Sequence, residues 1–235
     1  MSSISNASFG SRIQNAKNLV SVVGLYPNFA PVRTEDSISA MTALIDSIDA
    51  ANNGVINGIN AYNKAVKARK EQFQSDAMSV TKLVSPIKNS IKAQYGAAST
   101  EAAQIDAILT RMRSSKPTIV MSNSGGDPIS ISNTEMSFGA LTLNFSNLIQ
   151  TLASFTDYAP IAPHLSVANL TLKRDGLVTI NAAAATTLFE LQTNRNTRSS
   201  LYEDLKIRIS RIKSYVSAVY GNTSREHKGI SKFVV

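Results

Sequence analysis

The chain contains one motif twice, and this repetition limits its possible folds more than any other feature. IKNSIKAQYGAASTEAAQI, from Ile87, aligns without a gap with IKSYVSAVYGNTSREHKGI, from Ile212, and eight of the nineteen positions are identical. Two further pairs occur in the same order: SFGSRIQNAKNL at Ser8 with SFGALTLNFSNL at Ser137, and LYPNFAP at Leu25 with DYAPIAP at Asp157. This order predicts one module used twice, at about 8–116 and about 137–235.

The length difference between the two copies indicates their secondary structure. The offset is 132 residues between the LYPNFAP and DYAPIAP segments and 125 at the Tyr-Gly motif, so seven residues are missing from the second copy. Removing seven residues from a helix turns its apolar stripe by only about 20°. The same removal from a strand would exchange its two faces. The intervening segment is therefore predicted to be helical in both copies.

Apolar residues recur at intervals of three and four, as on the buried stripe of a helix. The positions, which are apolar except for Asn52, Thr187 and Arg198, are Ile38, Met41, Ile45, Ile48, Asn52, Val55, Ile59, Tyr62 and Val66 in the first copy, and Leu177, Ile180, Ala184, Thr187, Leu191, Arg198, Tyr202, Leu205, Ile209, Ile212, Val216 and Val219 in the second. One helix from about Glu35 to Tyr95 would be roughly 90 Å long, with Pro86 kinking or breaking it. Because the stretches near Asn63–Glu71 and Asn194–Ser200 are strongly polar, a helical hairpin in each copy is the alternative.

Each predicted long helix lies between two corners. The residues assigned to them are Tyr26, Pro27, Tyr158 and Pro160 before the helix, and Tyr95, Gly96, Tyr220 and Gly221 after it. Proline cannot continue a helix, which places the first corner. Glycine supplies the positive φ that is needed where a helix ends, which places the second. Ser99 and Ser224 are then expected to cap the next short helix.

The segment between the copies has a different composition. Its apolar residues Ile119, Val120, Met121, Ile129 and Ile131 flank the turn residues SNSGGDP, a pattern typical of a short β-hairpin. Ser132 and Glu135 form a capping box for the following helix. The sequence therefore predicts a mainly α fold, in which a tandem duplicated helical module forms an elongated helix bundle. The modules are 1–116 and 137–235, and the β-hairpin connector is 117–136.

Charge and composition exclude some classes of protein. A net charge of +8 would attract nucleic acid or anionic lipid, but Pro117–Leu172 contains no Lys or Arg, and elsewhere the basic residues are mixed with acidic ones. No cysteine is present, so disulfide and thiol chemistry are excluded. The N-terminus lacks the pattern of a conventional signal peptide, and Met136–Thr156 is too rich in Thr, Asn and Gln to span a bilayer. We expect a cytoplasmic or non-classically exported protein.

The sequence shows no sign of catalysis. Neither His164 nor His227 has a histidine or cysteine one helical turn away, as a helical metal site would. Motifs for nucleotide binding, for a serine hydrolase and for a zinc protease are all missing. The acidic pair Asp46 and Asp49 is typical of a solvated helix face. We therefore expect no enzyme, no cofactor and no metal.

The C-terminal segment NRNTRSSLYEDLKIRISRIKSYVSAVYGNTSREHKGISKF resembles a pattern of small bacterial helical-repeat proteins, in which Arg-Asn, Leu-Tyr, Ile-Lys-x-Tyr and Tyr-Gly-x-x-Ser follow in order. The resemblance covers roughly the last forty residues. It extends more weakly to the first copy, at Arg69, Phe73, Ile87, Lys88, Tyr95 and Gly96. The first copy lacks the Asn-Thr-Arg-Ser-Ser run. The resemblance implies helices and brings no activity with it.

Three functions are compatible with this pattern. Repeated helical surfaces favour a structural protein that self-associates into an oligomer or filament. The central stretch 117–172, which has no Lys or Arg and few acidic residues, is expected at the contact, because interface centres are poor in charge. The first alternative is a membrane-active, pore-forming-like protein in which the hairpin acts as a tongue. The second is a basic nucleic-acid-binding protein, whose affinity would fall steeply with salt. A homo-oligomer is the expected partner, and nucleic acid and membrane are less favoured.

Overall fold

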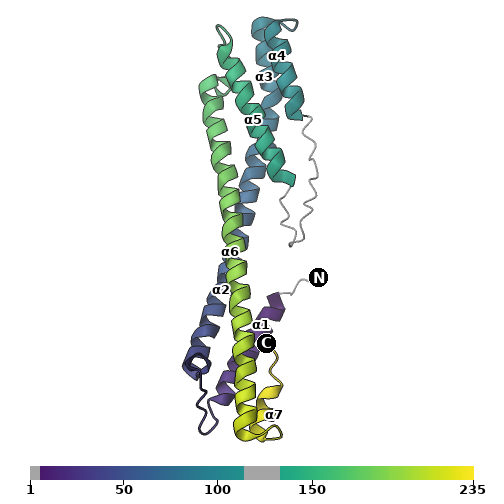
Figure 1. The fold of residues 1–235 in the computed structure, drawn as a ribbon. Coiled ribbons are helices and arrows are strands. Elements are labelled where there is room, and N and C mark those ends of the chain that lie inside the picture. The colour runs from purple at the N-terminus through teal and green to yellow at the C-terminus, as the bar shows by residue number, and fades with distance from the viewer. Residues whose placement is uncertain (1–5, 114–132) are drawn as a thin grey trace. The chain divides into compact units, whose positions relative to one another are not determined.

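The computed structural model describes residues 6–113 and 133–235. Every regular element in these ranges is helical, so the prediction of a mainly α protein is confirmed (Figure 1). The elements are α1 (Asn6–Val23), α2 (Ile38–Lys70), a π-helical segment (Glu71–Ser75), α3 (Val80–Tyr95), α4 (Thr100–Arg113), α5 (Asn133–Ser154), α6 (Val167–Tyr220) and α7 (Arg225–Ser231), with 3-10 turns at Thr34–Asp36 and Pro163–Leu165.

The chain packs into two units that cut across the predicted modules. Unit 1 is Met1–Asn60 with Phe189–Val235, and unit 2 is Ala61–Leu188. Unit 1 therefore combines α1 and the start of α2 with the end of α6 and α7. Unit 2 combines the rest of α2, α3 and α4 with α5 and the start of α6. The modules 1–116 and 137–235 remain a prediction about the sequence pattern.

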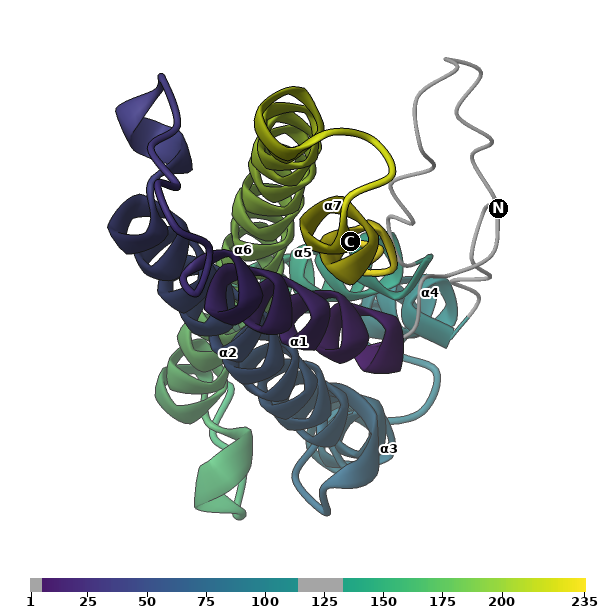
Figure 2. The ribbon, with the colours of Figure 1, turned by 90° about the horizontal axis from the view of Figure 1, so that it is seen from below.

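Unit 1 has its own apolar core, in which segments far apart in the sequence meet. Side chains of α1, α2, α6 and α7 bury one cluster that includes Leu19, Met41 and Ile230. Asn15 on α1 donates a hydrogen bond to the carbonyl of Val234 at 2.8 Å. Figures 1 and 2 show α1 and α7 side by side. The two ends of the chain are thus held in one unit.

An aromatic pair under an arginine closes the core of unit 1. The ring centroids of Phe9 and Tyr202 are 4.9 Å apart. The guanidinium of Arg198 lies 4.1 Å from the centroid of Phe9, a distance at which a cation is attracted to a ring face. The Tyr202 hydroxyl donates to the carbonyl of Phe9 at 3.0 Å. This contact ties α6 to the start of α1.

Unit 2 contains the same arrangement on other residues. The ring centroids of Phe73 and Phe138 are 4.7 Å apart, and the guanidinium of Arg69 lies 4.9 Å from the centroid of Phe138. All three residues differ by 129 positions from their counterparts in unit 1. The core around them draws on α3, α4, α5 and α6. Each unit therefore contains a pair of aromatic rings packed beneath an arginine.

An asparagine on the buried stripe occurs at matching places in both units. Asn52 donates to the hydroxyl of Tyr202 at 3.2 Å, and Asn181 donates to the hydroxyl of Thr142 at 3.2 Å. The side-chain oxygens of both asparagines are buried and have no hydrogen-bond partner among the described residues. The hydroxyl comes from α6 in unit 1 and from α5 in unit 2. Asn52 thus has a fixed partner on α6.

The prediction of one helix from Glu35 to Tyr95 is wrong. The helix α2 ends at Lys70, the π-helical segment follows, and α3 begins only at Val80. Pro86 lies inside α3 and does not end it. The second copy differs, because α6 runs without interruption from Val167 to Tyr220. The polar stretch Asn194–Ser200 lies within it, so the hairpin alternative is wrong there.

The prediction that the second copy lacks seven residues is also wrong, because the first corners of the two copies lie 129 positions apart in the sequence. Asn28 and Asp157 are the two described non-glycine residues with positive φ, and both have a φ of 64°. The turns they begin have the same hydrogen bonds, for example from Ser37 to Thr34 and from Ser166 to Pro163. The copies therefore differ by four residues. The extra four lie between Phe73 and Val80, where α2 is interrupted.

The β-hairpin connector 117–136 was assigned largely to residues that the structure does not describe. The tongue residues Ile119, Val120, Met121, Ile129 and Ile131 and the cap residue Ser132 all lie outside the described ranges. At its end the assignment is wrong, because α5 already begins at Asn133.

Candidate functional site

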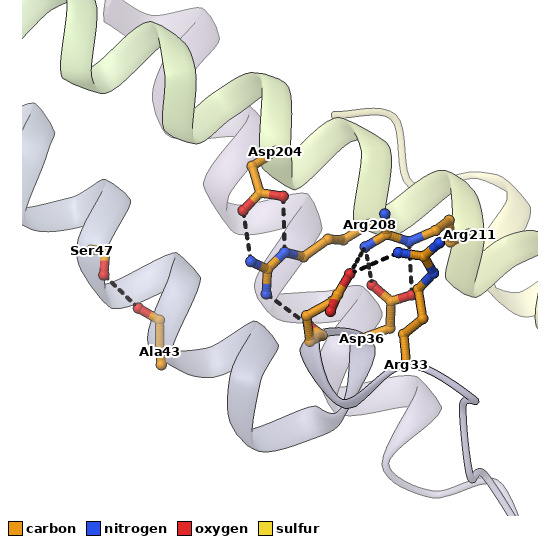
Figure 3. A network of polar contacts seen from close by, with 8 residues as sticks. Arg33, Asp36, Ala43, Ser47, Asp204, Arg208 and Arg211 are labelled. Carbon is orange, nitrogen blue, oxygen red and sulfur yellow. Dashed lines mark hydrogen bonds and ion pairs between the residues drawn. The ribbon is translucent and has the colours of Figure 1, made fainter.

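The turn between α1 and α2 carries an ionic cluster in unit 1. The carboxylate of Asp36, only 4 % exposed, accepts two hydrogen bonds from Arg211 on α6 (Figure 3). The distances are 2.8 Å from Nε to Oδ2 and 2.7 Å from Nη2 to Oδ1. This two-pronged geometry is the strongest form of an arginine–carboxylate pair. The hydrogen bond to Asp36 raises the pKa of Arg211.

A second arginine extends this contact along α6. Arg208 donates to both oxygens of Asp204, one turn earlier on the same helix, at 3.0 Å and 2.7 Å. Its Nη1 donates to the carbonyl of Glu35 at 2.7 Å. Because Asp204 holds the guanidinium in place, Arg208 can cap the turn with little loss of side-chain freedom. The two arginines together fasten the turn to α6.

Tyrosines form the rest of the corner in unit 1. Tyr26 and Tyr220, both assigned to corners from the sequence, pack edge to face with centroids 5.7 Å apart. The Tyr220 hydroxyl donates to the carbonyl of Pro27, and that of Tyr26 donates to the carbonyl of Glu226 at 2.7 Å. Burial raises the pKa of Tyr26. The predicted corner residues thus meet each other across the unit.

A tyrosine that the sequence reasoning missed lies beside them. The ring of Tyr215 stands perpendicular to that of Phe29, with centroids 5.4 Å apart. Its hydroxyl accepts a hydrogen bond from the backbone N–H of Ala30 at 3.1 Å. The signal was available, because Tyr215 lies in the Ile-Lys-x-Tyr motif. Tyr215 therefore fills the angle between α6 and the turn.

The corresponding corner of unit 2 uses Tyr95 and Tyr158. The Tyr95 hydroxyl donates to the carbonyl of Thr156 at 2.9 Å, and its ring lies edge-on to Phe155. The Tyr158 hydroxyl donates to the carbonyl of Leu165 at 3.0 Å. Burial raises the pKa of Tyr158. The sequence paired Tyr158 with Tyr26, but by its place in the turn it corresponds to Phe29.

An apolar groove opens at this corner of unit 2. Its volume is about 460 Å³, against about 180 Å³ for the hollow at the same place in unit 1. It is lined by Pro86, Asn89, Ser90, Ala93, Gln94, Ala159, Pro160, Ile161, Ala162 and Leu165. No charged side chain is among these. The two corners therefore differ in the size of their hollows.

Three positions differ between the corners; two of the differences open the groove, and the third removes the ionic cluster. Ser90 stands where unit 1 has Tyr215, Pro86 where it has Arg211, and Leu165 where it has Asp36. The first two replace long side chains by short ones, so the space between α3 and the turn is left open. The third replaces a buried charge by a buried aliphatic side chain. The ionic cluster of unit 1 therefore has no counterpart here.

The corners that follow α3 and α6 depend on glycine. Gly96 has a φ of 95° and a ψ of 153°, and Gly221 has a φ of 93°. This pair of angles at Gly96 is not the left-handed helical conformation expected from the sequence, but an extended one that is almost exclusive to glycine. Ser99 and Ser224 cap the helices that follow, accepting from backbone N–H groups at 3.1 Å and 3.0 Å.

The described residues show little chemistry beyond these corners. No group of three His, Asp or Glu side chains among them could hold a metal ion, and His164 is exposed at the turn of unit 2. Several lysines and arginines are paired with carboxylates on neighbouring helices, such as Lys17 with Asp49 and Lys88 with Asp106. No helix in the described ranges has the length and apolar character to cross a membrane.

No protein-family model, curated protein sequence or solved structure matches this chain.

Proposed function

We propose that the chain is a structural protein, formed by duplication of a helical module, that associates with further copies of itself through its two proline turns. The matched corners and the shared offset of 129 support the duplication. One observation carries the proposal for association. Val32 in unit 1 is 95 % exposed, and Ile161, at the matching place in unit 2, is fully exposed.

Both side chains project from rigid turns. Val32 follows Ala-Pro in one turn and Ile161 follows Ala-Pro in the other, and each proline fixes its own φ and restricts the alanine before it. Holding an aliphatic side chain in water costs the free energy that its burial would return, about 1.5–3 kcal/mol. Because both matching positions carry this cost, we infer that both side chains are buried in a contact with another copy. Ile161 also lies in the stretch without Lys or Arg, as the centre of an interface would.

Two like contact sites make each copy bivalent. A bivalent copy can bind one neighbour at each site, and a contact that does not close into a ring then grows into a filament. Each turn lies within one unit, so the two sites exist however the units are placed.

The experiment compares assembly of the wild type with variants Val32→Asp, Ile161→Asp and the double variant. Sedimentation velocity over a range of concentrations should show large species only for the wild type. Each single variant should associate about tenfold to hundredfold more weakly, since 1.4 kcal/mol is a factor of ten. Val234→Asp, at another exposed valine, is the matched control. A wild type that stays monomeric, or a double variant that assembles normally, refutes the proposal.

A further inference from the structure

The apolar groove of unit 2 has the form of a missing aromatic ring. In unit 1 the matching place is filled by Tyr215, whose ring packs against Phe29 and whose hydroxyl accepts from the N–H of Ala30. Unit 2 retains the backbone group that receives the hydroxyl of such a ring, because Ala159 stands at the place of Ala30. Tyr158 stands at the place of Phe29, but it does not line the groove, and its hydroxyl is turned to the carbonyl of Leu165 and to Ser90.

At the polar end of the groove, Gln94 takes the hydrogen bond that Tyr215 accepts in unit 1. The N–H of Ala159 donates to Oε1 of Gln94 at 3.3 Å, a longer contact than the 3.1 Å bond between Ala30 and Tyr215. Gln94 is exposed, and its Nε2 also donates to the carbonyl of Asp157, so a ligand that displaces the side chain breaks both contacts. A ligand hydroxyl at the position of the Tyr215 oxygen would accept from Ala159, and the amide of Gln94 would return to water.

The apolar part of the groove also suits a ring. Pro86, Ala93 and Leu165 provide aliphatic walls, and Ser90, which also lines the groove, is much shorter than Tyr215 at the matching position of unit 1. An apolar cavity of about 150 Å³ is enough for benzene. A volume of about 460 Å³ therefore leaves room for a substituent on the ring.

We propose that this groove is a binding site for a small phenol, whose ring occupies the place of the Tyr215 side chain and whose hydroxyl accepts a hydrogen bond from the N–H of Ala159. The class expected is a phenol with a small apolar substituent opposite the hydroxyl. p-Cresol, which is the side chain of tyrosine as a free molecule, is the probe. The proposal does not depend on self-association.

The test is a titration of the full chain with p-cresol, followed by isothermal calorimetry and by ligand-observed NMR. One saturable site with a Kd below about 1 mM is expected. Toluene, which has the ring and the methyl group but no hydroxyl, should bind up to about tenfold more weakly, since one hydrogen bond is lost. No saturation with p-cresol up to 10-fold above that concentration overturns the proposal, and so does equal binding of toluene.

Two variants locate the site. Ser90→Tyr supplies the ring internally, as Tyr215 does in unit 1, and should abolish binding of p-cresol. Ser85→Tyr adds the same side chain at an exposed position of α3 outside the groove and should bind as the wild type does. Ala93→Leu fills the groove by another route and guards against a folding defect in Ser90→Tyr. Unchanged binding in both filling variants overturns the proposal.

Sedimentation of the same samples separates a free ligand from a second copy of the chain. If the wild type does not bind p-cresol and Ser90→Tyr weakens self-association, the occupant is a side chain of another copy and the proposal is wrong. If p-cresol binds while assembly is unchanged, the small-molecule site stands whatever the fate of the proposed function.

Discussion

The hydroxyl that accepts a hydrogen bond from the buried asparagine belongs to a different residue in each unit. This difference allows one prediction to be worked out in detail. Tyr202→Phe removes the hydroxyl that accepts from Asn52 and donates to the carbonyl of Phe9. The Asn52 amide then has no described partner for either of its ends, since its oxygen already lacks one. Leaving such buried groups unpaired costs about 1–3 kcal/mol. We expect unit 1 to lose about 2 kcal/mol of stability.

Unit 2 indicates how the loss can be repaired. There the residue matching Tyr202 is Phe73, and the hydroxyl comes from Thr142, which matches Ile13. Ile13→Thr should therefore destabilise the wild type, because it buries a hydroxyl in place of apolar surface. In Tyr202→Phe the same change should supply the partner that Asn52 has lost. The double variant is expected to be more stable than the sum of the single effects, by about 1–2 kcal/mol.

The assay is a double-mutant cycle measured by urea unfolding of the four proteins. Unequal denaturant slopes would show that the units unfold separately, and the cycle is then applied to the transition that Tyr202→Phe shifts. Thr142→Val with Phe73→Tyr is the reciprocal cycle in unit 2 and should show the same sign. Additivity within about 0.5 kcal/mol in both cycles would refute the idea that either of two positions can supply the hydroxyl for the buried asparagine.

Three further outcomes are expected. Gly96→Ala should destabilise unit 2 by about 1–3 kcal/mol, since a Cβ there meets no atom and only the backbone is strained; Gly176→Ala, in open space inside α6, should instead stabilise it by up to about 1 kcal/mol in the same urea assay. Arg211→Met should lower the melting temperature, because Asp36 stays buried without its partner, and the double change with Asp36→Leu should restore most of it. Burial raises the pKa of Tyr202 above 10.0, so its contribution to stability is complete below pH 10 and is lost as the pH rises through the folded pKa. Tyr202→Phe should therefore make the free energy of unfolding less dependent on pH in that range.

The sequence was sufficient for the helical character of the chain and for the corners at Gly96 and Gly221, because these signals are local. Intervals of three and four mark a buried helical stripe, and positions such as Met41, Ile48 and Leu205 on it are indeed buried. Gly96 and Gly221 marked the ends of α3 and α6 because the positive φ at these positions strongly favours glycine. These features depend on neighbours a few positions away, which a sequence displays directly.

The register at the first corner was misjudged for an identifiable reason. The segment DYAPIAP contains Ala-Pro twice, at Pro160 and Pro163, so it can be aligned with LYPNFAP in two ways. Only the backbone distinguishes them, through the positive φ of Asn28 and Asp157. The interruption after Lys70 was missed because QSDAMS contains neither glycine nor proline.

The partners of each helix could not be predicted from the same pattern. An apolar stripe fixes which face of a helix is buried but not which other stripe covers it, and the two copies have similar stripes. The cluster of Asp36, Arg208 and Arg211 joins residues more than 170 positions apart. The groove is defined by a ring that is missing at Ser90, and it became visible only once Tyr215 was seen at the matching place.

The division of the chain into units has a consequence for its synthesis. Unit 2 consists of one continuous stretch and is complete once residue 188 has left the ribosome, whereas unit 1 needs Phe189–Val235 to cover helices made at the very beginning. At 5–20 residues per second, α1 waits on the order of ten seconds for α7. During that delay the C-terminal half of a neighbouring nascent chain can take the vacant place. Polysomes carrying this message would then yield exchanged pairs, whose share should grow with the density of ribosomes.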